Sequence, residues 1–89
     1  MNVNHELTQR LDDSYMIEIG GSTWNPEKIS IRRRYDNPGS GKFSPHGSSE
    51  LPVCAIEDIV RVACENDLFD ADTCAAMLSH LSASIQRIK

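Results

Sequence analysis

Apolar and polar residues alternate in two segments of the chain, and this alternation predicts two β-strands. Every second residue is apolar or aromatic over residues 15–19, and the same period continues over residues 28–35. A period of two places these side chains on one face of a strand. The intervening residues 20–27 are rich in Gly, Asn and Pro, which favour turns. We therefore predict an antiparallel β-hairpin over residues 14–35, with a third strand as an open alternative.

A helical period replaces this alternation in the last third of the chain. Apolar side chains form one stripe over residues 53–63, with Pro52 expected at the first helical position and Asn66 as the stop. Asp70 is a favoured N-cap for a second helix that runs to residue 89. The stripe of this second helix consists of Cys74, Leu78, Leu81, Ile85 and Ile88. Because the link between the two helices is short, we expect them to be adjacent and antiparallel.

The remaining segments are less patterned. The four-residue spacing of Val3, Leu7 and Leu11 favours a short amphipathic helix in the N-terminal segment, residues 1–13. Residues 36–51 are rich in Gly, Pro and Ser, so we predict a loop there. The sequence thus predicts an α+β fold in which the hairpin packs on a C-terminal helical hairpin, residues 52–89. At 89 residues, the length is typical of a single domain, residues 1–89.

Cysteine content and hydropathy indicate the cellular compartment in which we expect the protein. Cys54, Cys64 and Cys74 are odd in number, and all lie in the predicted helical half, where we expect them to act as small apolar core residues in a reducing compartment. The first residues lack the basic and apolar regions of a secretory signal. No apolar stretch approaches the roughly 18 residues that a transmembrane helix needs. We therefore expect a cytoplasmic protein that does not enter a membrane.

The formal net charge of -4 conceals a segregation of charge along the chain. Residues 1–27 carry five acids and one arginine, and residues 51–89 carry six acids and three basic residues, for charges of -4 and -3. Residues 28–50 between them carry five basic residues and two acids, which gives +3. A dedicated DNA-binding domain is usually basic overall. The charge balance therefore disfavours that class.

Catalytic and metal-binding motifs are absent from the sequence. A phosphate-binding loop requires a glycine five residues before its Gly-Lys pair and Ser or Thr after it, but Asp36 and Phe43 occupy those positions around Gly41-Lys42. Neither G-x-S-x-G nor H-E-x-x-H occurs. The cysteines are ten residues apart, so they would not share one helical face as close zinc ligands do. We therefore expect no enzymatic activity, no metal and no cofactor.

Acidic residues concentrate in the predicted helical half, where six occur within 16 residues. Such a cluster is consistent with an ordinary solvated helix face. It is also consistent with a negative surface that selects a basic protein partner by charge complementarity. We take the second interpretation as the leading hypothesis. The candidate partner-binding residues are Glu57, Asp58, Glu65, Asp67, Asp70 and Asp72.

Two alternatives remain open. In the first, Arg32, Arg34, Tyr35 and Lys42 bind nucleic acid by contacting phosphates and stacking on a base, although basic residues also protect exposed strand edges from aggregation. Arg33 lies on the apolar face of its strand, where it must pair with an acid or point out at the end of the sheet. In the second, the chain is a structural subunit that forms a homodimer through the stripe of its last helix, at Leu78, Leu81 and Ile85.

In size, acidity, mixed α+β pattern and absence of catalytic motifs, the chain resembles the small inhibitor proteins of phages and mobile elements, of which the anti-CRISPR proteins are the best-known examples. The resemblance is at the level of class and rests on no shared motif, so it assigns no residue a role. It implies a non-enzymatic inhibitor that binds a basic surface on a nucleic-acid-processing complex.

Overall fold

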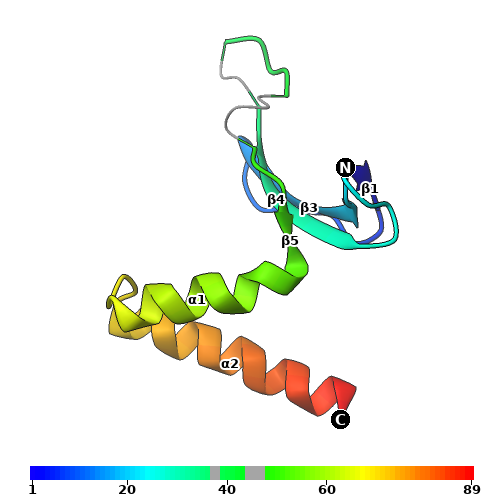
Figure 1. Ribbon diagram of the computed structural model, residues 1–89. Coiled ribbons are helices and arrows are strands. Elements are labelled where there is room, and N and C mark those ends of the chain that lie inside the picture. The colour runs from blue at the N-terminus through cyan, green and yellow to red at the C-terminus, as the bar shows by residue number, and fades with distance from the viewer. Residues whose placement is uncertain (37–38, 44–47) are drawn as a thin grey trace. The chain divides into compact units, whose positions relative to one another are not determined.

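The computed structural model describes residues 1–36, 39–43 and 48–89, and it confirms the predicted α+β class (Figure 1). The sequence predicts one domain over residues 1–89, whereas the structure groups the chain into two compact units. The first, Met1–Ile56, contains the β-strands and is called the sheet unit below. The second, Glu57–Lys89, contains the two α-helices apart from the first residue of α1 and is called the helical unit. We describe each unit by itself.

The predicted hairpin is confirmed and forms the centre of an antiparallel sheet of five strands. Its strands are β3, Tyr15–Gly21, and β4, Ile29–Tyr35, with Ile17 opposite Arg33 and Ile19 opposite Ile31. Three two-residue strands extend the sheet. They are β1, Asn2–Val3, and β2, Gln9–Arg10, which both pair with β3, and β5, Leu51–Pro52, which pairs with β4.

The helix predicted near the N-terminus is wrong, because residues 2–3 and 9–10 are strands of the sheet. Side chains in this segment support turns that compete with a helix. The Asn4 Oδ1 atom accepts a hydrogen bond from the Glu6 backbone N–H, at 3.0 Å. Gly20 allows β1 to approach β3 closely, since a Cβ atom at that position would clash with the Asn2 carbonyl oxygen. The segment is therefore held by pairing to β3 and by local turns.

The segment predicted as a loop, residues 36–51, contains more structure than expected. Asp36 forms an isolated antiparallel bridge with Phe43, and Leu51 belongs to β5. Residues 37–38 and 44–47 of this prediction lie outside the described residues. Pro52 is also in β5 rather than at the first helical position, so that expectation is wrong. A proline fits the end of an edge strand, where its missing N–H costs no ladder hydrogen bond.

The face of the hairpin that the fold buries is the polar one. Glu18 is 2% exposed and Ser30 is fully buried, whereas Ile17, Ile19 and Ile31 on the opposite face are only half-buried. The Ser30 hydroxyl forms a hydrogen bond with that of Ser22, which is buried on the same side. Among the described residues, no buried side-chain polar atom lacks a hydrogen-bond partner. Hydrogen bonding thus offsets the cost of burying this face.

A hydrogen-bonded carboxylate joins the β3–β4 loop to the residues before β5. Both Glu50 carboxylate oxygens accept hydrogen bonds from Thr23, one from its backbone N–H and one from its hydroxyl, each at 2.8 Å. Burial raises the pKa of Glu50, but these hydrogen bonds and the nearby α-amino group outweigh it, so the net shift of the pKa is downward. Glu50 is therefore held as a carboxylate that fixes the loop.

The helices begin and end close to the predicted positions. A 3₁₀ helix, η2, spans Val53–Ala55 and leads into α1, Ile56–Glu65. Asn66 follows α1 directly, as predicted, and its side-chain amide donates to the Val62 carbonyl at 2.8 Å. The second helix, α2, spans Ala71–Ile88. The predicted N-cap is confirmed, because Asp70 Oδ1 accepts a hydrogen bond from the Thr73 backbone N–H at 2.7 Å.

Burial in the helices differs from the expectation. No residue of α1 or α2 is fully buried, and the predicted stripe of α2 is open to solvent, with Leu78 at 69% and Ile88 at 81% exposed. All three cysteines are free and exposed, so the prediction that they occupy a core is wrong. Over the described parts of the chain, no helix combines the length and the apolar character that crossing a membrane requires.

Candidate protein-binding surface

The six acidic residues singled out in the sequence lie on α1, on the turn between the helices and on the first turn of α2, and all six are exposed. Their surroundings differ. Arg61 forms ion pairs with Asp58 at 3.6 Å and with Glu65 at 3.0 Å, one helical turn away on either side. These pairs are solvent-exposed, so each contributes little to stability. They nevertheless leave Asp58 and Glu65 less available to a partner.

Asp70 has a structural role, because it caps α2. The hydrogen bonds from Thr73 lower the pKa of the Asp70 carboxyl, which keeps the cap ionised. Glu57, Asp67 and Asp72 differ from it, since their carboxylates have no hydrogen-bond or ion-pair partner among the residues that the structure describes. These three carboxylates are therefore the ones whose charge is free for a partner.

Exposed apolar side chains accompany the acids on the same elements. Ile59 and Val62 of α1 are about half exposed, and Leu68 in the turn is 72% exposed. Asp67, beside Leu68, has a left-handed backbone conformation with φ of 52°, which turns the chain sharply between the helices. Protein interfaces combine an apolar centre with a polar rim. We call this set the acidic–apolar surface: Glu57, Asp58, Ile59, Val62, Glu65, Asp67, Leu68, Asp70 and Asp72.

A second apolar feature of the helical unit is a shallow groove of about 150 Å³ between its helices. Val60 and Cys64 of α1 contribute one wall, and the other wall comes from α2, from Cys74, Met77, Leu78 and Leu81. Phe69, from the turn, lies at the same groove. The two helices therefore meet over few side chains, which explains why the stripe of α2 stays open.

The basic strand is occupied by contacts within the sheet unit. Arg32 Nε donates to Glu18 Oε1 at 2.8 Å, and Arg34 contacts the second oxygen of the same carboxylate at 3.6 Å. Arg34 Nε also lies 3.2 Å from Asp36 Oδ1. Both guanidinium groups lie over the Phe43 ring, at 4.7 and 4.8 Å from its centroid. These contacts give Arg32 and Arg34 a structural role, which does not support their assignment to nucleic-acid binding.

The other two residues of the nucleic-acid hypothesis lie apart from this network. Tyr35 is on the opposite face of the sheet, where its ring lies 6.0 Å from that of Tyr15. Arg33 is exposed, and its guanidinium lies over the rings of the last pair of the β3–β4 ladder, at 3.8 Å from Tyr15 and 5.0 Å from Tyr35. Lys42 is exposed. The structure therefore does not gather Arg32, Arg34, Tyr35 and Lys42 into one surface.

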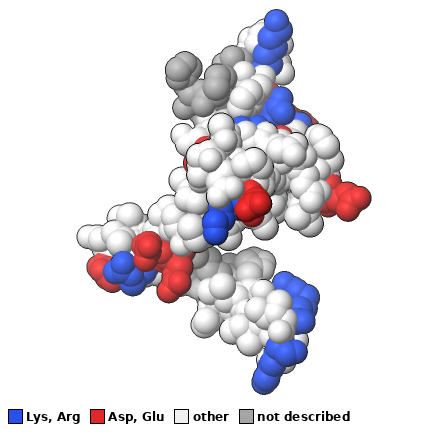
Figure 2. Space-filling view, turned by 45° about the vertical axis from the view of Figure 1, so that its right-hand side comes forward, with Lys and Arg blue, Asp and Glu red and all other residues white. Residues whose placement is uncertain are grey.

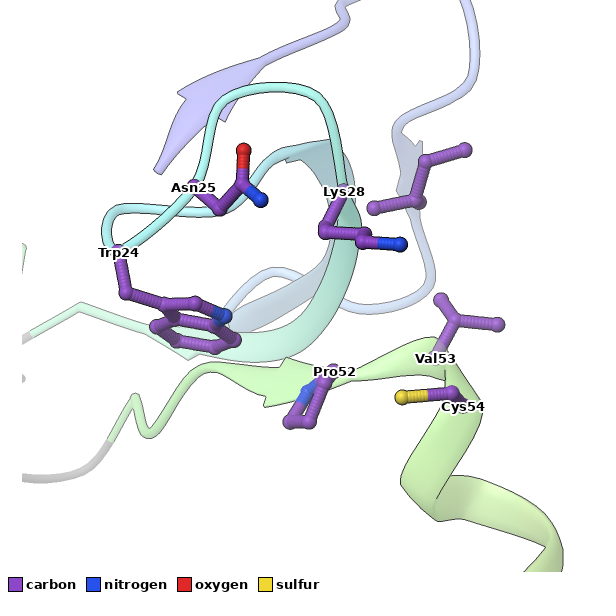
Figure 3. Close-up of a pocket in the computed structure, with 7 residues that line it drawn as sticks. Trp24, Asn25, Lys28, Pro52, Val53 and Cys54 are labelled. Carbon is purple, nitrogen blue, oxygen red and sulfur yellow. The ribbon is translucent and has the colours of Figure 1, made fainter.

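The sheet unit contains a hollow of about 480 Å³ that the sequence did not predict (Figure 3). Trp24, Asn25 and Lys28 come from the β3–β4 loop, and β5 and η2 supply Pro52, Val53 and Cys54. Its lining is mainly apolar, with one ammonium group, which is typical of binding rather than of proton transfer. The only signal in the sequence was Trp24, an aromatic residue within a turn-forming segment.

The network of Glu18 with Arg32 and Arg34 was also missed from the sequence, although the alternation in the two predicted strands contained the information needed to find it. Glu18 and Arg32 lie on corresponding faces of the two predicted strands, and only the register was needed to pair them. In the described ranges 1–36, 39–43 and 48–89, no group of three or more His, Cys, Asp or Glu residues is placed to hold a metal ion.

Comparison with known proteins gives no relative from which a function could be inferred. No family model matches the sequence, and searches of curated proteins and of solved structures found no match.

Proposed function

We propose that this chain is a non-enzymatic inhibitor that binds a protein partner through the acidic–apolar surface of its helical unit. The observation that carries the proposal is the coexistence of free carboxylates at Glu57, Asp67 and Asp72 with an exposed apolar residue, Leu68, on α1, the adjoining turn and the first turn of α2. A basic partner surface would be attracted by the carboxylates, and the apolar side chains would be covered in the complex.

The class of partner follows from the charge. Carboxylates that present negative charge along a helix and a turn can occupy the place of phosphates on a basic protein surface. A partner that normally binds nucleic acid has such a surface. We therefore propose a nucleic-acid-processing complex as the target, which agrees with the resemblance to anti-CRISPR-type inhibitors. Inhibition would be stoichiometric, because the chain would act by occupying the surface.

The experiment begins with affinity capture of partners on the immobilised chain from host lysate, with and without nuclease, followed by mass spectrometry. The captured protein is then purified, and its binding to labelled nucleic acid is measured with increasing amounts of the chain. We expect capture to survive nuclease and the nucleic acid to be displaced at a stoichiometric ratio. Capture that disappears with nuclease would contradict the proposal and favour a nucleic-acid-binding chain.

Matched variants locate the surface. The triple variant Glu57→Gln, Asp67→Asn, Asp72→Asn removes three free carboxylates and leaves the Asp70 cap intact. The control, Glu6→Gln, Asp13→Asn, Glu27→Gln, removes the same charge from exposed residues of the sheet unit. We expect the first variant to weaken partner binding by about 10-fold or more and the control by much less. Equal effects would show that net charge, rather than this surface, governs binding.

A further inference from the structure

The last helix carries an apolar seam that the rest of the helical unit leaves more than half exposed, although part of the seam also lines the groove beside α1. Cys74, Leu78, Leu81 and Ile85 follow one side of α2, and all four are exposed. The α2 residues that are partly covered, Met77 and Ser84, lie beside this seam. From Cys74 to Ile85 the seam extends about 17 Å, at a rise of about 1.5 Å per residue.

The spacing of the seam is the same in both directions along the helix. Its residues follow at intervals of four, three and four, and Ala71 and Ile88 extend it by three at either end. Intervals of three and four keep apolar residues on one side of a helix and are the pattern of paired helices. When two such helices run antiparallel, Leu78 of one lies opposite Leu81 of the other, and Cys74 lies opposite Ile85.

The charges of α2 select the antiparallel direction. Asp70 and Asp72 lie at its N-terminal end, Arg87 and Lys89 lie at its C-terminal end, and no Asp, Glu, Lys or Arg lies between them. Figure 2 shows one group of basic side chains at one end of the helical unit, whereas the acidic side chains lie at the other end with a further basic group among them. A parallel pair would place like charges side by side, whereas an antiparallel pair brings the acidic end of each helix level with the basic end of the other. The helix dipoles also favour the antiparallel arrangement.

We infer that α2 pairs with α2 of a second copy of this chain, antiparallel, through the seam Cys74, Leu78, Leu81 and Ile85. The contact is isologous, since each copy presents the same surface to the other. Ala75 and Ser82 lie near the seam, and their small side chains permit close approach of the two helices. Pairing covers apolar area that a single chain exposes, and this burial is the driving force. The acidic–apolar surface, on α1, the turn and the first turn of α2, uses none of the four seam residues.

The first test is the mass of the full chain in solution, measured by sedimentation or light scattering over a range of concentrations. We expect twice the chain mass of 9.9 kDa. The double variant Leu81→Glu, Ile85→Glu should weaken dimerisation by about 100-fold or more, because it places four carboxylates in the seam of the dimer. The matched control His80→Glu, Ala83→Glu alters the opposite face of the same helix and should remain dimeric. Far-UV circular dichroism checks that both variants keep their helices.

The second test concerns direction, and it uses a chain in which the three native cysteines are replaced by serine. One sample then carries Leu78→Cys, and another carries Leu81→Cys. In the antiparallel register, the two variants form a mixed disulfide on mild oxidation far faster than either links to itself. Faster linkage of each variant to itself would overturn the antiparallel pairing. A monomer at every concentration, or an unchanged dimer in the seam variant, would overturn the seam as the contact. These tests need no partner protein, so they can fail independently of the proposed function.

Discussion

The two units of this chain differ in which side chains they bury: the sheet unit buries polar groups, and the helical unit leaves apolar groups exposed. The sheet unit buries a carboxylate and several hydroxyls, Glu18 and Ser30 among them, and satisfies each with hydrogen bonds. The helical unit buries no side chain within its helices and exposes large apolar residues such as Leu78. A polar network fixes geometry, whereas an open apolar face requires something to cover it. The difference indicates that hydrogen bonds specify the structure of the sheet unit, and it is the reason that both of our proposals place association on the helical unit.

The largest effect expected within this comparison comes from removing the buried carboxylate. Glu18→Ala leaves the Arg32 and Arg34 guanidinium groups without the anion that they share, and loss of one partner of a buried pair costs about 3–5 kcal/mol. We expect a loss of about 3 kcal/mol in the free energy of unfolding, measured by urea denaturation. A loss below about 1 kcal/mol would mean that the pair behaves as a surface ion pair.

The next largest effect is expected from a substitution that tests how closely β1 approaches β3. Gly20→Ala places a Cβ atom against the backbone of Asn2 and Val3, and crowding of this kind costs about 1–3 kcal/mol. We expect β1 to be displaced, which hydrogen exchange at its amides would show. Gly39→Ala is the matched control, because a Cβ atom there meets nothing within 4 Å. Equal stabilities of the two variants would contradict the close approach.

In the helical unit, the corresponding test is a substitution that removes the N-cap of α2. Asp70→Ala removes the acceptor for the Thr73 N–H, so we expect lower helical ellipticity and a lower thermal midpoint. Asp72→Ala, two residues further along in the first turn of α2, is the control and should have a smaller effect. Because the folded state lowers the pKa of Asp70, the cap contributes above the unfolded carboxyl pKa and its contribution is lost as pH falls through the folded value. A melting profile of Asp70→Ala with the same acid dependence as the parent chain would argue against this linkage.

The smallest effect concerns the apolar face of the sheet. Arg33→Ala removes the guanidinium that lies over Tyr15 and Tyr35, and cation–π contacts at exposed sites contribute about 0.5–1 kcal/mol. We expect a loss in that range by denaturant titration. Arg33→Lys keeps the charge but not the planar stacking group, and it should recover only part of the stability. Full recovery with lysine would assign the effect to charge alone.

Local patterns in the sequence predict the parts of this fold that depend on local physics. The alternation at Ile29 and Ile31, the stop at Asn66 and the cap at Asp70 are each decided by neighbours in the chain. The strands β1, β2 and β5 are two residues long, so they present no period to detect. They form because the edges of the central hairpin offer free hydrogen-bonding groups.

Burial was harder to predict than secondary structure, and Glu18 shows why. Its alternation with isoleucines shows that the carboxylate lies on the other face of the strand but not whether that face is buried, and the register of β3 with β4 places it beside Arg32. The contacts of the candidate surface were likewise harder to predict than its residues. The six acids could be found from the sequence, but the division between paired Glu65, capping Asp70 and free Asp67 depends on side-chain geometry.

The short loop between β3 and β4 has a consequence for the order in which the chain folds. Closing residues 22–28 brings the two longest strands together at a low entropic cost, whereas bringing β5 to β4 requires closure over residues 36–50. We therefore expect the hairpin and its glutamate–arginine pair to be formed in the rate-limiting transition state, with β1 and β5 added later. Substitutions at Glu18 would then slow folding, while those at Gly20 would accelerate unfolding.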